Sequence, residues 1–481
     1  MQTRNLIGEA WVGAASGREL DVTDPATDEV VATVPLGGQA EARAAIDAAR
    51  QALDAWRARP AIERSHLLRR VSDLMLERQE DLARLMTREQ GKPLAESRGE
   101  IAYAASFIEF ASEEAKRVYG EVVPASRTNQ RILVLRQPVG VTACITPWNF
   151  PAAMITRKLG PALAAGCTMV VKPASQTPLS ALAIGAIARE AGIPPGVVNV
   201  VTGSARAIGD ELLTNPIVRK VSFTGSTEVG KTLMQKAAHH VTRLSLELGG
   251  HAPFIVFDDA DLDAAVKGAV ATKYRNMGQT CICANRFYVQ DGVFDAFRDR
   301  LAATVERMRI GRGTDEGVQV GPLIDDAAVE KVAEHVDDAR AKGARVVTGG
   351  GLADPIDGLS RRFYRPTVLD GFTDEMLINR EETFGPVAPL RRFRHEDEAV
   401  ELANGSIYGL AAYFYTRDAS RLIRVAERLE YGIVGANDGV PSTAQAPFGG
   451  MKQSGFGREG GKYVMDEYVE VKYVSWGVSP G

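Results

Sequence analysis

The spacing of apolar residues changes along the chain, and each change predicts a different secondary structure. Residues 5–36 form short alternating stretches broken at Asp24-Pro25 and Pro35, which predicts a leading β-hairpin. Apolar residues then recur at helical spacing. Pro60 is typical of a first helical turn and Gly91 of a helix end. Three amphipathic helices, which we assign to the scaffold, are expected at 39–59, 60–90 and 94–119.

From residue 121 to residue 257 the apolar runs are short, and beyond residue 146 segments with helical spacing separate them. The extended runs expected in this part are 131–136, 139–146, 168–172, 197–201, 220–224, 243–248 and 253–257. Such alternation is typical of successive βαβ units, so it predicts an α/β fold with a mostly parallel sheet covered by helices on both faces. Ligands bind beyond the carboxyl ends of such strands, and we expect the site residues in the turns that follow them.

A second α/β stretch follows residue 258, and the chain ends in a further strand. Helices are expected at 262–276 and 294–308, and strands at 345–348 and 365–369. Residues 468–474 alternate between apolar and polar. A terminal strand with no obvious partner in its own chain can pair with a neighbouring subunit, so we expect a homo-oligomer, either a dimer or a tetramer. An internal edge strand is the alternative.

The composition is typical of a soluble globular enzyme with more than one domain. The chain has 481 residues, of which 45% are hydrophobic and 25% charged. Its 57 basic and 61 acidic residues give a net charge of -4 without a Lys/Arg cluster, so we expect no nucleic-acid partner. No apolar run spans a bilayer and the first residues resemble no targeting segment, so we expect no membrane contact and a cytoplasmic location. Four cysteines are too few for a disulfide framework.

Two of the four cysteines, Cys281 and Cys283, stand one residue apart after a Gly-Gln-Thr turn. We interpret Cys281 as a nucleophile, with a small buried hydrophobic residue as the alternative. A free thiol has a pKa of about 8.5, so such a nucleophile needs a helix N-terminus or a cationic cofactor ring beside it. The spacing fits no zinc site, and none of the six histidines has a signature that ties it to Cys281, so we expect no metal. Cys144 and Cys167 lie in apolar contexts and are interpreted as core residues.

Two turns after predicted strands have the chemistry of a cofactor site. Gly225 and Ser226 lead into a helix whose first N–H groups suit a pyrophosphate, although the usual G-x-G-x-x-G pattern is missing. An ordinary helix cap is the alternative there. Lys172 ends another strand, where it reaches a phosphate or ribose hydroxyls, or is a surface lysine.

Two more polar residues stand at predicted strand ends. Asn149 lies between Pro147 and Pro151, and its side chain is either an oxyanion donor or a turn residue. Glu247 lies in an apolar strand before two glycines. Partial desolvation there would raise its pKa toward the range of a general base, and a salt-bridged glutamate is the alternative.

Seven short stretches occur in a fixed order over nearly the whole chain: PWNFP, KPAS, FTGST, LELGG, GQTC, EETFGP and PFGG. In order and spacing they resemble the aldehyde dehydrogenase superfamily, and within it most closely the NADP-type succinate-semialdehyde dehydrogenases. The resemblance implies a Rossmann-type cofactor-binding domain, an α/β catalytic domain and a small β element for oligomerisation. The corresponding ranges are 1–120 with 141–248, then 249–462, and 121–140 with 463–481.

The resemblance also implies a mechanism. Cys281 attacks the aldehyde carbon, while the Asn149 side chain and the Cys281 backbone N–H bind the oxyanion. Hydride transfer to NADP, or to NAD, leaves a thioester, and Glu247 activates the water that releases the acid. The positions that match the family's cofactor contacts are Trp148, Asn149, Lys172, Ser175, Gly225, Ser226, Leu248, Glu382 and Phe384.

Selectivity is implied by a few further positions. Relatives with Glu in place of Ser175 tend to select NAD, because that carboxylate repels a 2′-phosphate, so Ser175 with Lys172 predicts a preference for NADP. The residues that match the family's grip on the distal carboxylate of succinic semialdehyde are Arg157, Arg275 and Ser442. Pairing of either arginine with an internal Asp or Glu is the alternative. A longer substrate such as glutarate semialdehyde, or a broader range of aldehydes, is the alternative specificity.

Cys283 has two interpretations. In some relatives the thiol at this position forms a disulfide with the nucleophile, and in others it is a packing residue. For the whole chain, a catalytically silent binding protein is a further alternative, which the intact Cys281, Glu247 and Asn149 disfavour. A cofactor-independent thiol hydrolase would leave the cofactor turns without a purpose.

Overall fold

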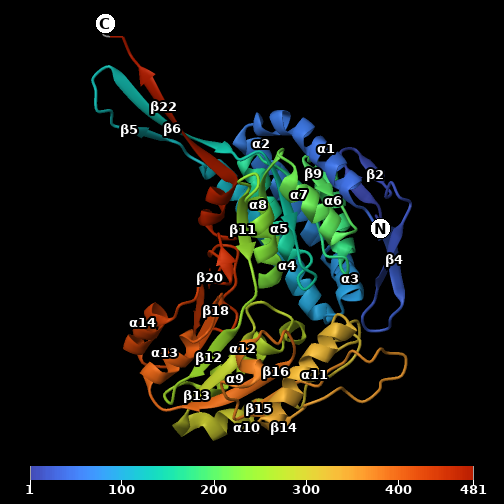
Figure 1. The fold of residues 1–481 in the computed structure, drawn as a ribbon, viewed down its shortest axis with the longest axis vertical. Coiled ribbons are helices and arrows are strands. Elements are labelled where there is room, and N and C mark those ends of the chain that lie inside the picture. The colour runs from blue at the N-terminus through green and yellow to red at the C-terminus, as the bar shows by residue number, and fades with distance from the viewer. Residues whose placement is uncertain (1, 480–481) are drawn as a thin grey trace.

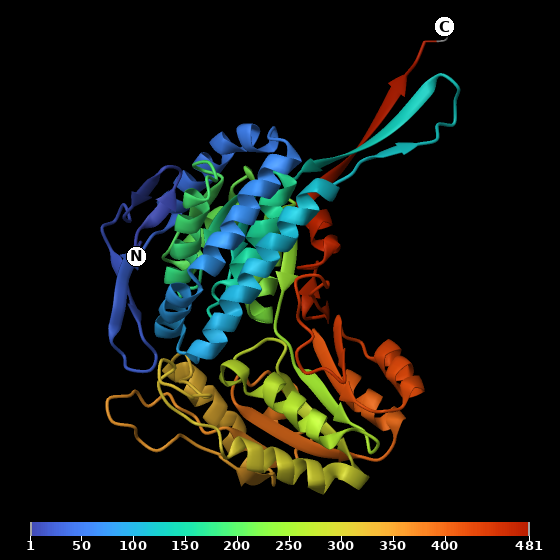
Figure 2. The ribbon, with the colours of Figure 1, turned by 180° about the vertical axis from the view of Figure 1, so that it is seen from behind.

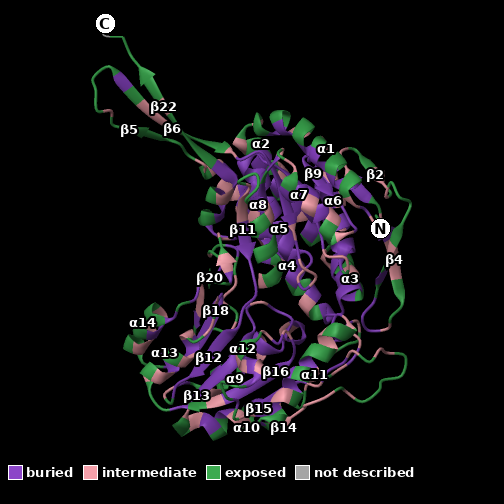
Figure 3. Cartoon of the chain, in the orientation of Figure 1, coloured by how far each residue is buried: buried purple, intermediate pink, exposed green. Residues whose placement is uncertain are grey.

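The chain folds into two lobes, each built on a large β-sheet, and an arm that projects from the first lobe (Figure 1). The computed structural model describes residues 2–479. Buried residues follow the strands of both sheets, whereas most of the arm is exposed (Figure 3). Within the described residues, no helix combines the length and the apolar character that crossing a membrane requires.

The sheet of the first lobe has eight strands in the order β2-β1-β9-β8-β7-β10-β11-β21. They are β1 (Asn5–Ile7), β2 (Ala10–Val12), β7 (Val141–Ile145), β8 (Thr168–Lys172), β9 (Val198–Val200), β10 (Val218–Thr224), β11 (Arg243–Glu247) and β21 (Gly455–Phe456). The central strands from β9 to β11 run parallel. The edge strands β1, β2 and β21 pair antiparallel. The parallel sheet expected from the βαβ pattern is therefore confirmed.

Helices cover both faces of this sheet. They are α1 (Gln39–Arg57), α2 (Ala61–Glu77), α3 (Gln79–Gln90), α4 (Leu94–Glu114), α5 (Ala153–Ala165), α6 (Pro178–Glu190), α7 (Ala205–Thr214) and α8 (Thr227–Ala237). The helices α1, α7 and α8 share one core with Val170, and α2 to α6 share the other with Val171. Neighbouring residues of β8 enter different cores because successive side chains of a strand point to opposite faces. Figure 2 shows the N-terminal helices across the back of the lobe.

The N-terminal region contains more elements than its pattern predicts. The structure has two hairpins where one was expected: β1 pairs with β2, and β3 (Glu19–Thr23) pairs with β4 (Val30–Pro35). Four helices replace three, because the segment 60–90 breaks at Arg78. No glycine or proline marks this break. Both helices pack on α4 and α6, and α2 packs on α5 as well. Gly91 ends α3 in a left-handed conformation, as expected.

The second lobe has a seven-stranded sheet in the order β14-β15-β16-β13-β12-β18-β19, parallel except for the β14–β15 pair. Its strands are β12 (Ala252–Val256), β13 (Ala284–Gln290), β14 (Arg345–Thr348), β15 (Thr367–Asp370), β16 (Val387–Phe393), β18 (Ala411–Tyr415) and β19 (Ile433–Ala436). Its helices are α9 (Leu262–Lys273), α10 (Phe294–Val305), α11 (Asp326–Ala341), α12 (Leu377–Arg380), α13 (Glu396–Asn404) and α14 (Ala419–Arg428). The strand expected at 253–257 is present as β12, but it belongs to this sheet and not to the first.

The arm is a three-stranded antiparallel sheet in the order β22-β6-β5. Its strands are β5 (Glu121–Val123), β6 (Gln130–Pro138) and β22 (Val469–Gly477). The terminal strand β22 pairs along the whole of β6, so the expectation that it lacks a partner in its own chain is wrong. No local pattern indicates this pairing, because the two strands are far apart in the sequence. The last two residues of the expected element 463–481 lie outside the described residues.

Several short elements complete the chain. They are β17 (Tyr408–Gly409), β20 (Met451–Lys452), η1 (Ala115–Arg117), η2 (Arg275–Gly278), η3 (Asp291–Val293) and η4 (Lys462–Tyr468). The residues that follow β7, β10 and β11 line a cavity together with residues of the second lobe. The strand edge at which ligands were expected is therefore the edge at the lobe boundary.

Candidate active site

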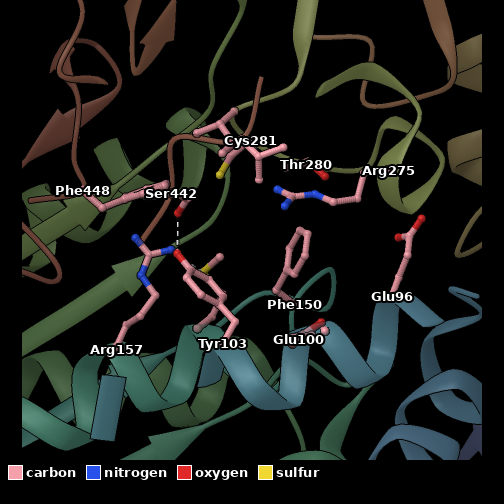
Figure 4. Close-up of a pocket in the computed structure, with 14 residues that line it drawn as sticks. Glu96, Glu100, Tyr103, Phe150, Arg157, Arg275, Thr280, Cys281, Ser442 and Phe448 are labelled. Carbon is pink, nitrogen blue, oxygen red and sulfur yellow. Dashed lines mark hydrogen bonds between the residues drawn. The ribbon is translucent and has the colours of Figure 1, made fainter. Parts of the chain in front are cut away.

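Two cavities meet at Cys281, which lines both of them. The Trp148 cleft, of about 390 Å³, is lined by Pro147, Trp148, Asn149, Thr224, Gly225, Ser226, Leu248, Gly249, Cys281, Ile324, Asp325, Ala327, Ala328, Lys331, Glu382, Thr383 and Phe384. The Arg275 cavity, of about 280 Å³, is lined by Glu96, Gly99, Glu100, Tyr103, Phe150, Met154, Arg157, Arg275, Thr280, Cys281, Ile282, Val440, Ser442 and Phe448 (Figure 4). Molecules in the two cavities would therefore approach the same thiol.

Cys281 lies in the turn between η2 and β13, not at a helix N-terminus. Asn276 and Met277 have φ angles of 49° and 54°, and Gly278 has a φ of 75°. A Cβ atom on Gly278 would lie 2.1 Å from the carbonyl oxygen of Gly385, so only glycine fits there without a shift. This tight left-handed turn fixes the segment that presents the thiol.

The Cys281 thiol is not activated by its protein surroundings alone. Burial raises its pKa to about 12, and the positive charge of Arg157 opposes this only in part. At neutral pH the group is therefore a thiol, and a proton acceptor or an added positive charge is needed to form the thiolate.

Glu247 is the last residue of β11 and is buried. Within residues 2–479, neither of its carboxylate oxygens has a hydrogen-bond partner. Burial and the neighbouring Glu459 carboxylate raise its pKa well above the usual value, while Arg157 and Lys158 oppose the shift. A carboxyl group with a raised pKa suits a general base, although Glu247 is not among the residues that line the two cavities.

Asn149 follows β7 and lines the Trp148 cleft. Its side chain is buried, and its Nδ2 donates to the carbonyl of Gln279 at 3.0 Å, two residues before Cys281. An amide nitrogen has two hydrogens, so this bond orients the side chain and leaves its second N–H available for another hydrogen bond. The predicted oxyanion donor and the predicted nucleophile are thus tied together by a hydrogen bond to the turn.

Seven of the nine residues predicted to contact the cofactor line the Trp148 cleft: Trp148, Asn149, Gly225, Ser226, Leu248, Glu382 and Phe384. The rings of Trp148 and Phe384 meet edge to face at 5.5 Å. Ser226 caps α8, its Oγ accepting from the Val229 N–H at 3.3 Å. Glu382 accepts from the Gly250 N–H at 3.1 Å, and burial raises its pKa to about 7. A helix N-terminus, a carboxylate that accepts from hydroxyls and flat aromatic walls fit a dinucleotide.

Lys172 and Ser175 are not among the residues that line the Trp148 cleft. Lys172 ends β8, two strands from β10, and its buried ammonium donates to the carbonyl of Pro173. Burial lowers its pKa to about 8. The Ser175 hydroxyl donates to the Gly203 carbonyl at 3.3 Å. Both residues lie farther along the same sheet edge.

The structure brings the three predicted substrate residues together with Cys281 (Figure 4). The guanidinium of Arg275 lies 5.3 Å from the Phe150 ring, and in the described chain its Nε has no hydrogen-bond partner. Arg157 differs, because its Nε lies 3.0 Å from a carboxylate oxygen of Glu459. Arg157 therefore has the internal acidic partner that was the alternative to substrate binding.

The helix α4, which we assigned to the scaffold, also lines the Arg275 cavity, so that assignment is wrong. Its cavity residues, Glu96, Gly99, Glu100 and Tyr103, recur at helical spacing on one face. The Tyr103 hydroxyl is hydrogen-bonded to Ser442. Glu96 and Glu100 stand one helical turn apart in the sequence, but solvent-exposed carboxylates have the same spacing, so no local signal marked these residues.

Cys283 points away from both cavities. It is buried, its thiol donates to the Thr272 carbonyl at 3.0 Å, and it lines neither cavity. All four cysteines are free thiols, and Cys144 and Cys167 are buried as expected. In this conformation Cys283 is a packing residue.

The chain is similar to known enzymes in both sequence and structure. The aldehyde dehydrogenase family matches residues 11–474. A glutarate-semialdehyde dehydrogenase of Pseudomonas putida is 60% identical over 97% of this chain and 96% of its own. An NADP(+) succinate-semialdehyde dehydrogenase of Escherichia coli is 59% identical over 98% and 97%. A crystal structure of an E. coli NADP-dependent enzyme superposes with a TM-score of 0.97 at 58% identity, covering 99% and 98%, which confirms the expected fold.

Proposed function

The chain belongs to the aldehyde dehydrogenase family, and on that premise we propose that it oxidises a semialdehyde with a terminal carboxylate, succinic semialdehyde, to the dicarboxylate. The observation that carries the proposal is the Arg275 guanidinium, whose Nε has no partner in the described chain and which lines a cavity that also reaches Cys281. A half-buried cation that forms no ion pair within the described residues favours a substrate that brings its own negative charge.

The first chemical step joins the aldehyde to Cys281. The sulfur attacks the aldehyde carbon as its proton leaves, and a buried carboxylate with a raised pKa, such as Glu247, is a suitable acceptor. The carbonyl oxygen becomes an oxyanion, which the remaining N–H of Asn149 Nδ2 and the Cys281 backbone N–H stabilise. Trp148, Gly225 and Glu382 would hold a nicotinamide cofactor in the Trp148 cleft, where it would take up the hydride from the same carbon and so leave a thioester on Cys281.

The second step releases the acid. After it has released the first proton to solvent, Glu247 takes a proton from water, and the hydroxide attacks the thioester carbonyl. The carbon–sulfur bond breaks, and the proton on Glu247 passes to the leaving sulfur, which frees the carboxylic acid and the Cys281 thiol. Because Glu247 is buried at a strand end, it acts here by local movement or through a water molecule. The same oxyanion donors serve this step.

We propose NADP as the preferred cofactor, with NAD accepted. No carboxylate stands at position 175, and Lys172 adds a positive charge at the same sheet edge. An E. coli relative at 59% identity is named for NADP, which agrees with this preference.

Glutarate semialdehyde is the second candidate substrate. A relative at 60% identity is named for it, and its carboxylate would meet the same Arg275. The two semialdehydes differ by one methylene, which is worth only about 1–3 kcal/mol in a hydrophobic pocket. We therefore expect the enzyme to select for the terminal carboxylate more strongly than for the length of the chain.

A panel of aldehydes tests the proposal. Aldehydes of increasing chain length, each with and without a terminal carboxylate, are compared at saturating NADP and at saturating NAD. The expected result is that kcat/KM is highest for succinic semialdehyde with NADP and lower for butanal. Equal kcat/KM for butanal and succinic semialdehyde would contradict the carboxylate specificity, and a higher value with NAD would contradict the cofactor preference.

A further inference from the structure

A buried ion pair lies behind Asn149 and takes no part in the chemistry described above. Lys92 follows α3, Glu100 belongs to α4, and their charged atoms lie 2.5 Å apart. Both side chains are almost completely buried. Exchanging a buried ion pair for apolar residues is often neutral for stability, so stability alone gives no reason for one here.

The pair holds the main chain on both sides of Asn149. The Lys92 ammonium donates to the Asn149 carbonyl at 2.6 Å. The second carboxylate oxygen of Glu100 accepts from the N–H groups of Ala152 at 2.9 Å and of Ala153 at 3.2 Å. The ion pair therefore clamps the turn between β7 and α5, the turn that contains the predicted oxyanion donor.

The same carbonyl is also tied to the turn that carries the nucleophile. The Nδ2 of Asn276 donates to the Asn149 carbonyl at 3.0 Å and to the Gln279 carbonyl at 3.2 Å. Asn276 is in turn held by Gln90, whose Nε2 donates to its Oδ1 at 3.0 Å. One hydrogen-bonded network thus fixes both the Asn149 main chain and the turn before Cys281.

We propose that Lys92 and Glu100 are positioning residues that hold the Asn149 side chain in register with Cys281. The inference rests on the proposed oxidation of an aldehyde at Cys281. A loose Asn149 main chain would shift its Nδ2 away from the oxyanion. A misplacement of about 1 Å at a reacting centre lowers a rate by up to about a hundredfold, so the loss should appear in kcat and not in cofactor binding.

The test compares Lys92→Met with the double variant Lys92→Met/Glu100→Gln. The single variant leaves an unpaired buried carboxylate, so its Tm should fall, whereas the double variant should recover most of the Tm. The kcat of both should remain about 10- to 100-fold below that of the original chain, with an unchanged Kd for NADP and an unchanged rate of Cys281 alkylation by iodoacetamide. Recovery of kcat together with Tm would show a merely structural pair and overturn the proposal.

Two further variants keep the test decisive. Asn276→Gly retains the left-handed backbone but removes the donor to the Asn149 and Gln279 carbonyls, so it should also lower kcat. If the double variant does not fold, an unchanged kcat of Lys92→Met overturns the proposal. Lys220→Met removes another buried lysine, paired with Glu467 near the opposite end of β10, and should lower Tm only. The assay uses any aldehyde that the original chain oxidises. No turnover of any aldehyde would defeat the proposed function, whereas active variants of an active enzyme would defeat only this inference.

Discussion

At the scale of single residues, the charged side chains of the site are buried or half-buried and only partly neutralised. Glu247, Glu96 and Glu382 all have raised pKa values because burial disfavours their charged forms. The Nε of both arginines lacks a hydrogen-bond partner in the part of the chain that the structure describes, but Arg157 lies in ion-pair contact with Glu459, at 3.0 Å, and Arg275 has no such contact there. The two arginines are thus unequal, and Arg275 is the one left to bind an added anion.

Arg275→Met should weaken the binding of carboxylate substrates alone. Loss of charge-assisted hydrogen bonds costs about 1.5–3 kcal/mol, so KM for succinic semialdehyde should rise about 10- to 100-fold. Steady-state kinetics with succinic semialdehyde and with butanal measure the effect. The butanal KM serves as the control and should change little. An unchanged KM for succinic semialdehyde would rule out the grip by Arg275.

Glu96 should make the binding of anionic substrates depend on pH. It lines the Arg275 cavity, burial raises its pKa to about 7, Lys92 and Arg275 lower that pKa, and Glu100 raises it. Above this pH the ionised Glu96 offsets the charge of Arg275, so KM for succinic semialdehyde should rise between about pH 6 and about pH 8. A bound substrate carboxylate favours the protonated form of Glu96, so the substrate binds more tightly at low pH and KM again rises with pH.

Measuring KM across this range, with butanal as the neutral reference, checks the prediction. Glu96→Gln cannot ionise, so its KM for succinic semialdehyde should stay flat over the same range. A rise of equal size in that variant would assign the pH dependence to another group.

At the scale of elements, the site depends on turns more than on helices or strands. Two strand ends of the first sheet supply Asn149 and Glu247, and one turn of the second lobe supplies Cys281. The helix α4 adds a polar face to the Arg275 cavity. Rigid strands fix where each turn starts, while the turns fix the side chains that react.

Gly278→Ala should disrupt the turn before Cys281. The residue has a φ of 75°, and an added Cβ would lie 2.1 Å from the Gly385 carbonyl oxygen. A left-handed conformation costs an alanine about 1–2 kcal/mol before this overlap is counted, so both Tm and kcat should fall. Thermal unfolding and steady-state kinetics measure them.

Gly351→Ala is the matched control, because no atom lies within 4 Å of its added Cβ. It should leave both Tm and kcat nearly unchanged. Normal kcat in Gly278→Ala would mean that the turn does not set the position of the nucleophile.

At the scale of the whole molecule, three parts have separate tasks in our proposal. The first lobe would bind the cofactor and the second would supply the nucleophile, with the site at their boundary. The arm has few neighbours in its own chain, and its exposed apolar side chains include Val471, Tyr473 and Trp476. Such an arm would be covered in a homo-oligomer, whether a dimer or a tetramer.

The double variant Val471→Lys/Tyr473→Lys should weaken this assembly, because charges on the edge strand β22 disfavour its burial. Size-exclusion chromatography with light scattering should show an oligomer for the original chain and a smaller species for the variant. Ile423→Lys, at an exposed apolar residue of α14, is the control and should leave the mass unchanged. A monomeric original chain would contradict the proposed role of the arm.

The sequence by itself determined the family, the parallel sheet and the order of the reactive turns. These depend on local signals, since apolar periodicity defines strands and helices, and short motifs place Asn149, Glu247 and Cys281 at their ends. Strands such as β8 therefore match their expected bounds.

Only the tertiary structure decided which distant residues meet. The pairing of β22 with β6, the partner of Arg157 and the hydrogen bond from Lys92 to Asn149 all join segments far apart in the chain. No local period contains such contacts, because they depend on how whole elements pack against one another.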